Sequence, residues 1–163
     1  MAVAFDNVVF AGGSGLSVTT GTFTIAGTDR AAMLHITLDD TSVTIVSATC
    51  GGVAGTLVAG TDSGSSIGFR RTLIYQVIAP ATGSQVASVV FSGSVSNPHL
   101  AAITATGVDQ TTPCNNGTFV VQAAATSKAI TVTSANGDLT STCIYHAAGG
   151  GAPTTDQTIK WSD

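Results

Sequence analysis

The side chains that can perform acid–base or metal chemistry are few in this sequence, and they are spread along the chain. Its three histidines are His35, His99 and His146. A metal site needs two or three such side chains to converge, each held by an orienting partner. His35 and His146 fall on predicted strands and are the pair that could meet, whereas His99 follows a proline in a predicted loop. We expect structural roles and no metal site.

The carboxylates do not form an obvious catalytic pair. All nine acidic residues are aspartates, and Asp39 and Asp40 are the only adjacent two. Neighbours on a strand point to opposite faces, so we interpret this pair as turn-capping residues. Five aspartates lie in predicted turns where calcium could bind: Asp29, Asp39, Asp40, Asp62 and Asp109. The alternating aspartate spacing of a calcium loop is absent, so no calcium site is predicted.

Nucleophiles are either too common or too isolated to indicate a reaction. Serines and threonines abound, but no Gly-x-Ser-x-Gly elbow followed by a predicted helix is present. The run from Gly12 to Gly15 precedes a predicted strand, so no helix N-terminus follows it to hold a phosphate. Cys50, Cys114 and Cys143 are odd in number and have no Cys-x-x-Cys spacing, which favours free thiols in a reducing compartment. The sequence therefore predicts a protein that is not an enzyme and has no cofactor.

Charge and composition narrow the partners. Only 9% of the residues are charged, and the net charge of −4 argues against nucleic acid, which needs a basic face. No apolar run reaches the roughly 20 residues of a membrane helix, and the first residues lack the basic and apolar regions of a signal peptide. We therefore expect synthesis in the cytosol and a surface of hydroxyls and amides, which suits contacts with proteins and also with sugars. Trp161, Tyr75 and Tyr145 are too few to favour a sugar platform, and we expect them in the core or in an interface.

Short segments of alternating polarity, separated by turns, follow one another along the whole chain. This pattern, with no glutamate for exposed helices, predicts an all-β antiparallel sandwich, jelly-roll-like, of about 8–11 strands with little or no helix. We expect one domain over residues 1–163, with an N-terminal contact arm at 1–15. The predicted strands are residues 3–10, 22–25, 33–38, 43–48, 69–78, 86–92, 100–106, 119–123, 129–133, 139–146 and 158–161.

Two local patterns are specific enough to place side chains. Within residues 33–38, Leu34, Ile36 and Leu38 are expected to face the core while the residues between them face the other way. The glycine pair Gly51-Gly52 and the Asn136-Gly137 dipeptide both predict tight turns, because such residues accept positive φ.

Several segments resemble, in order, a recurrent β-sandwich module of phage-encoded and bacterial surface proteins. They are residues 43–53 (VTIVSATCGGV), 71–83 (RTLIYQVIAPATG), 89–93 (VVFSG), 106–113 (TGVDQTTP), 136–139 (NGDL) and 157–161 (QTIKW). The resemblance covers about residues 43–161. It implies a sandwich fold and, by context, a virion accessory protein, but no activity that transfers to particular residues.

The functional expectation is a structural virion protein. We expect a capsid decoration or cement protein, or a head fibre, that binds the major capsid protein as a homotrimer. The alternative is a carbohydrate-binding or adhesion module of a phage tail or cell surface. The candidate contact residues are Val3, Phe5, Val8, Phe10, Arg70 and Trp161.

Overall fold

The computed structural model describes residues 3–64, 70–114, 116–120 and 130–143, and over these residues it contains strands and no helix. The strands are β1 (Ala4–Gly12), β2 (Gly15–Thr19), β3 (Phe23–Ile25), β4 (Ala31–Leu38), β5 (Ile45–Cys50), β6 (Val53–Ala54), β7 (Thr56–Leu57), β8 (Arg71–Ile78), β9 (Gly83–Gln85), β10 (Ala87–Val95) and β11 (His99–Thr106). The predictions of an all-β chain and of about this many strands are confirmed.

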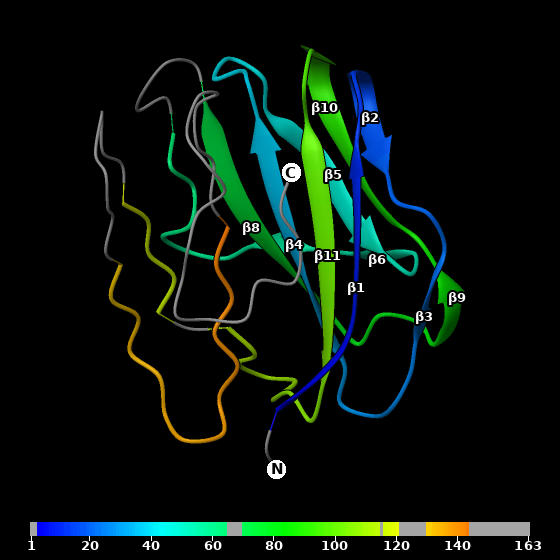
Figure 1. Cartoon of the computed structure of the whole chain (residues 1–163), viewed down its shortest axis with the longest axis vertical. Coiled ribbons are helices and arrows are strands. Elements are labelled where there is room, and N and C mark those ends of the chain that lie inside the picture. The colour runs from blue at the N-terminus through cyan, green and yellow to red at the C-terminus, as the bar shows by residue number, and fades with distance from the viewer. Residues whose placement is uncertain (1–2, 65–69, 115, 121–129, 144–163) are drawn as a thin grey trace, which may run out of the picture.

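The strands pair as one long hairpin wound into two sheets (Figure 1). The first strand pairs with the last, β2 with β10, β3 with β9, β4 with β8, and β5 with β6, and every pair is antiparallel. One sheet has the order β1-β11-β4-β8-β7 and the other β2-β10-β5-β6, while β3 and β9 form a short ladder of their own. This nested pairing across two packed sheets is the arrangement of a jelly roll, as predicted.

The tip of the long hairpin is the predicted glycine turn. Cys50 pairs with Val53, and Gly51 and Gly52 between them have φ angles of 56° and 75°. Two successive positive φ values are what a type I′ hairpin turn requires, and glycine adopts them without a steric penalty. The sequence therefore specifies the sharp turn at the tip of the long hairpin.

The core lies between the two sheets. Leu34, Ile36 and Leu38 of β4 are fully buried, and they pack in one cluster with Val89 and Phe91 of β10. The alternation predicted for residues 33–38 is confirmed, because the intervening side chains point to the other face of the five-stranded sheet. At about 1.5–3 kcal/mol for each fully buried large apolar side chain, this cluster supplies most of the stabilisation of the sandwich.

The central part of the face of the five-stranded sheet that points away from this core is buried as well. A row across its strands joins Ala101, His35 and Ile74, which are 1%, 2% and 9% exposed. Later parts of the chain contact this face: the Cys114 sulfur lies 3.1 Å from that of Met33, and the Ser141 hydroxyl 2.7 Å from the His35 ring. The five-stranded sheet thus has chain on both sides.

Part of the predicted strand pattern after β11 is wrong. Of the predicted strands at 119–123, 129–133 and 139–146, the structure describes residues 119–120, 130–133 and 139–143, and none of these is in a strand. Residues 130–140 are all exposed, so alternating side chains there have no second layer against which to pack. The Asn136-Gly137 turn is confirmed, closed by a hydrogen bond from the Asp138 amide to the Ala135 carbonyl. The predicted strand at 158–161 lies outside the described residues.

Candidate contact surface

Three of the predicted contact residues form one stripe on β1. Phe5, Val8 and Phe10 stand opposite Ala105, Ile103 and Ala101 of β11, all on the face that points away from the core. Strict alternation would put Phe5 on the other side, but the register shifts between Phe5 and Asn7 and so returns it to the face of Phe10. Phe5 is 41% exposed and Phe10 56%. We call Phe5, Val8 and Phe10 the β1 stripe.

Polar side chains at this bulge fix β1 against β3. The Asp6 carboxylate accepts hydrogen bonds from the Thr104 hydroxyl at 3.0 Å and the Ala26 amide at 3.3 Å. The Asn7 amide donates to the Thr24 carbonyl at 3.1 Å. The strand that carries the β1 stripe is therefore held in place from two sides.

The other predicted contact residues lie elsewhere. Val3 is partly buried in a small apolar cluster with Ala105 and Val108, and its amide donates to the Gly137 carbonyl. Arg70 precedes β8, which β11 and β4 separate from β1 in the sheet, and its Nε lies 3.6 Å from Asp39. Trp161, together with His146 and Tyr145, lies outside the described residues.

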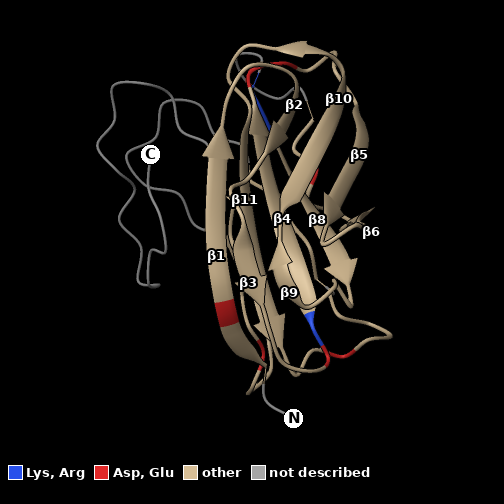
Figure 2. Cartoon of the chain, turned by 90° about the vertical axis from the view of Figure 1, so that its right-hand side faces the viewer, with Lys and Arg blue, Asp and Glu red and all other residues tan. Residues whose placement is uncertain are grey.

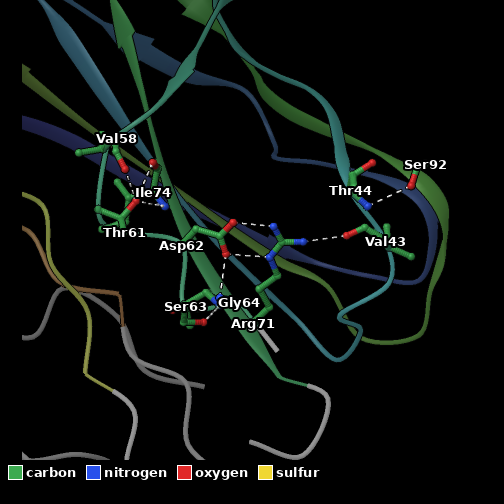
Figure 3. Close-up of polar contacts among 11 residues, drawn as sticks. Val43, Thr44, Val58, Thr61, Asp62, Ser63, Gly64, Arg71, Ile74 and Ser92 are labelled. Carbon is green, nitrogen blue, oxygen red and sulfur yellow. Dashed lines mark hydrogen bonds and ion pairs between the residues drawn. The ribbon is translucent and has the colours of Figure 1, made fainter. Parts of the chain in front are cut away.

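Arg71 and Asp62 form a clamp rather than a site (Figure 3). The Arg71 guanidinium donates to both Asp62 oxygens, at 2.8 and 2.6 Å, and to the Val43 carbonyl at 3.0 Å. The hydrogen bonds that Arg71 donates to Asp62 hold the pKa of the Asp62 carboxyl below its usual value and raise the pKa of the Arg71 guanidinium. This pair connects the loop before β8 to the segment before β5, and the Arg71 donors make hydrogen bonds within the fold.

The other turn aspartates also use their carboxylates locally. Asp40 accepts hydrogen bonds from the hydroxyl and amide of Ser42, each at 2.7 Å, and these bonds lower its pKa. Asp109 accepts from the amides of Thr111 and Thr112, with the same effect on its pKa. The capping role predicted for Asp40 is confirmed, whereas Asp39 faces Arg70. Within the described ranges, no three histidine, cysteine or acidic side chains lie close enough together to hold a metal ion.

Among the described residues a serine–histidine contact joins Ser141 to His35, and its histidine is buried. Ser141 and His35 are at the distance of a nucleophile and its base, but His35 is only 2% exposed. Burial lowers the pKa of His35 to about 4, against a smaller opposing effect of the Thr142 backbone. Burial also raises the pKa of Cys50 and Cys114 to about 11 and that of Cys143 to about 12. The Cys114–Met33 and Ser141–His35 contacts hold the segment after β11 against the sheet.

A polar hollow of about 820 Å³ lies where the β11 end, the Asn136-Gly137 turn and Val3 meet. Its lining includes the side chains of Asp29, Asp109, Gln110 and Asp138. One oxygen of Asp138 accepts from the Ala135 amide, and Asp109 caps its own turn. The hollow offers carboxylate and amide groups and no aromatic ring. It could take a small polar molecule through hydrogen bonds.

The outer face of the four-stranded sheet has a different character. Two rows run across β2, β10 and β5: Thr19, Ser88 and Thr49, then Ser17, Val90 and Ser47. The strands β2, β10, β5 and β6 contain no charged residue, and they are uniformly tan in Figure 2. We call these six residues the hydroxyl grid. The composition predicts a hydroxyl-rich surface but does not indicate which strands carry it.

Two apolar side chains border the hydroxyl grid. Val46 is 64% exposed and Leu16 60%, the highest values among the large apolar side chains of the described residues. Val46 is skipped by the pairing between β5 and β10, because Ser47 pairs with Val90 and Ile45 with Phe91. Leu16 lies in the register shift between β2 and β10. A bulge re-aims a side chain, which accounts for the exposure of Val46 although Ala48, two residues on, is buried.

Comparison with known protein families, with curated proteins and with solved structures found no match to this chain. In the described part of the chain no helix has the length and apolarity to cross a membrane. The all-β sandwich is therefore established by the structure itself, and the function has to be argued from its surfaces.

Proposed function

We propose that the protein is a non-enzymatic structural component of a phage particle, a capsid decoration (cement) protein or head fibre. In this proposal it is made in the host cytoplasm and binds the outer surface of the major capsid protein as a homotrimer, with β1 as its contact arm. It would stabilise the shell by spanning neighbouring capsid subunits. About 1,600 Å² of contact suffices for specific binding, and many copies on one shell make modest affinity effective.

The observation that supports this proposal best is the β1 stripe. Two phenylalanines, 41% and 56% exposed, stand on one face of a strand that bonds made by Asp6 and Asn7 hold in place. Aromatic side chains on a fixed strand contribute much binding energy and lose little entropy on contact. The low charge of the chain adds support, because few ions need to be desolvated in an interface.

Cosedimentation with phage particles that lack the protein tests the proposal. The wild type should bind at many copies per particle, and Phe10→Asp should reduce binding at least tenfold, as expected when a charge enters an apolar contact. Val132→Asp is the matched control, because Val132 is 40% exposed and lies in none of the strands. A wild type that stays in the supernatant would refute the proposal, and so would a Phe10→Asp variant that binds normally.

A carbohydrate-binding or adhesion role is the second candidate function. It is supported by the polar hollow, whose Asp109, Gln110 and Asp138 side chains are of the kind that bond sugar hydroxyls. A glycan array probed with the wild type and with Gln110→Ala would test this role. Saturable binding to one glycan class, lost in the variant, is the expected result if it holds. Equal signals for the two proteins would exclude the hollow as a sugar site.

A further inference from the structure

The outer face of the four-stranded sheet combines features that suit a contact with its own copy. The hydroxyl grid supplies five hydroxyl side chains and Val90, in two rows across three strands. A hydroxyl both donates and accepts hydrogen bonds, so a surface of hydroxyls is complementary to itself. Isologous contacts between two copies need this self-complementarity, because each copy presents the same patch.

Charge points to the same partner. The whole chain carries a net charge of −4, so two copies repel each other over most of their surface. The four strands of this sheet carry no charge at all. Two molecules can therefore approach through this face without like-charge contacts. A charged partner would find nothing here to complement it, and a sugar would find no aromatic ring among the six grid residues.

The two exposed apolar side chains supply a hydrophobic element. Val46 and Leu16 flank β10 on its two sides, on β5 and β2 respectively. Neither exposure serves the core, since Ala48 and Val18, two residues along each strand, fill it. Some grid hydroxyls already bond each other, as Thr19 and Ser88 do at 2.8 Å. The face is thus partly ordered before any partner arrives.

We propose that a second copy of this chain docks face to face on the four-stranded sheet, over the hydroxyl grid, Leu16 and Val46. The sheet is small: β2, β10, β5 and β6 have 5, 9, 6 and 2 residues, which at about 4.8 Å between strands and about 3.3 Å per residue cover roughly 350 Å² per copy. A pair then buries roughly 700 Å², at the low end of weak, transient interfaces. This contact goes beyond the proposed function, because it needs no particle and does not involve the β1 stripe.

Sedimentation equilibrium of the purified chain tests this pairing without any capsid. Between about 10 μM and about 1 mM, a concentration range that brackets weak interfaces, the weight-average mass should rise from that of the unpaired species toward twice that value. Val46→Lys should weaken the doubling at least tenfold, and Val132→Lys, the matched control, should leave it unchanged. A wild type of constant mass, or a Val46→Lys variant that doubles normally, would overturn the proposal.

A mixture of opposite charges guards against misfolding as the explanation. Val46→Lys and Val46→Glu should each fail to pair alone, because each pair then holds two like charges within an otherwise uncharged contact. Mixed at low salt, they should pair with each other at least as well as the wild type does. Failure of the mixture, with both variants folded by circular dichroism, would also overturn the proposal. None of these results depends on particle binding, so the capsid proposal can fail separately.

Discussion

The two outer faces of this sandwich are both formed by antiparallel strands, but the centre of one is buried and the other is exposed. On the five-stranded sheet the row of Ala101, His35 and Ile74 is buried, and the chain after β11 contacts it. On the four-stranded sheet the hydroxyl grid stands at the surface without a charged residue on its strands (Figure 2). This difference indicates that the side-chain chemistry of a face determines whether other parts of the chain pack on it. An apolar face with a neutral histidine is buried, and a face of hydroxyls can remain in water.

The largest expected effect comes from placing a charge on each face. Ala105→Asp puts a carboxylate at a position that is 6% exposed on the covered face. The cost of an unpaired buried charge should lower the free energy of unfolding by about 4 kcal/mol or more. Ser17→Asp on the exposed face should change it by no more than about 0.5 kcal/mol. Urea unfolding followed by far-ultraviolet circular dichroism measures both, and equal losses would remove the distinction between the faces.

The second effect is the acid sensitivity of the covered face. Burial lowers the pKa of His35 from its unperturbed 6.5 to about 4, so the folded state favours the neutral ring. The unfolded chain binds a proton below pH 6.5 and the folded chain only near pH 4. Stability is therefore unaffected above pH 6.5, falls between pH 6.5 and 4, and loses about 3 kcal/mol in all.

Urea midpoints measured across this pH range test the assignment to His35. The slope should flatten in His35→Gln, whose side chain does not titrate. The turn aspartates Asp40 and Asp109 have lowered pKa values, so their contribution is lost only at still lower pH. A His35→Gln variant as acid-sensitive as the wild type would show that another group is responsible.

Features that follow from local sequence rules could be predicted, whereas features that depend on the pairing between strands could not. Alternation correctly predicted that Leu34 faces the core while His35 faces away, and the Gly51-Gly52 pair predicted the hairpin tip. Both follow from local rules. The exposure of Val46 and the placement of Phe5 on the same face as Phe10 depend on register shifts against another strand. Such shifts carry no local signal in composition or period.

The segment after β11 shows the opposite failure. Residues 129–133 alternate as well as any strand in the chain, but the described residues 130–133 are exposed and lie in no ladder. Period alone does not distinguish a strand with a partner from one without. The contact of Ser141 with His35, which joins residues 106 positions apart, likewise had no signal in spacing.

A smaller effect should distinguish the Arg71–Asp62 clamp from the weaker Arg70–Asp39 ion pair. Asp62→Ala leaves the Arg71 guanidinium, only 16% exposed, without its two-pronged partner and should cost about 2 kcal/mol. Asp39→Ala removes a 3.6 Å contact to Arg70 whose side chains are about one-third exposed, and should cost less than about 0.5 kcal/mol. Thermal unfolding of both variants checks the order. A larger loss from Asp39→Ala would reverse our assignment of the clamp.

The most direct test of the central claim, that the centre of one outer face is covered and the other outer face is not, is thiol labelling of matched cysteines. Ala101→Cys places a thiol on the covered face, and Ser47→Cys places one in the hydroxyl grid. Maleimide labelling of dilute protein, located by peptide mass spectrometry, separates both from the native cysteines. We predict that position 47 reacts as fast as in the unfolded chain and position 101 at least about a hundredfold more slowly, as burial of the 1% exposed site requires. Equal rates at the two positions would contradict the account.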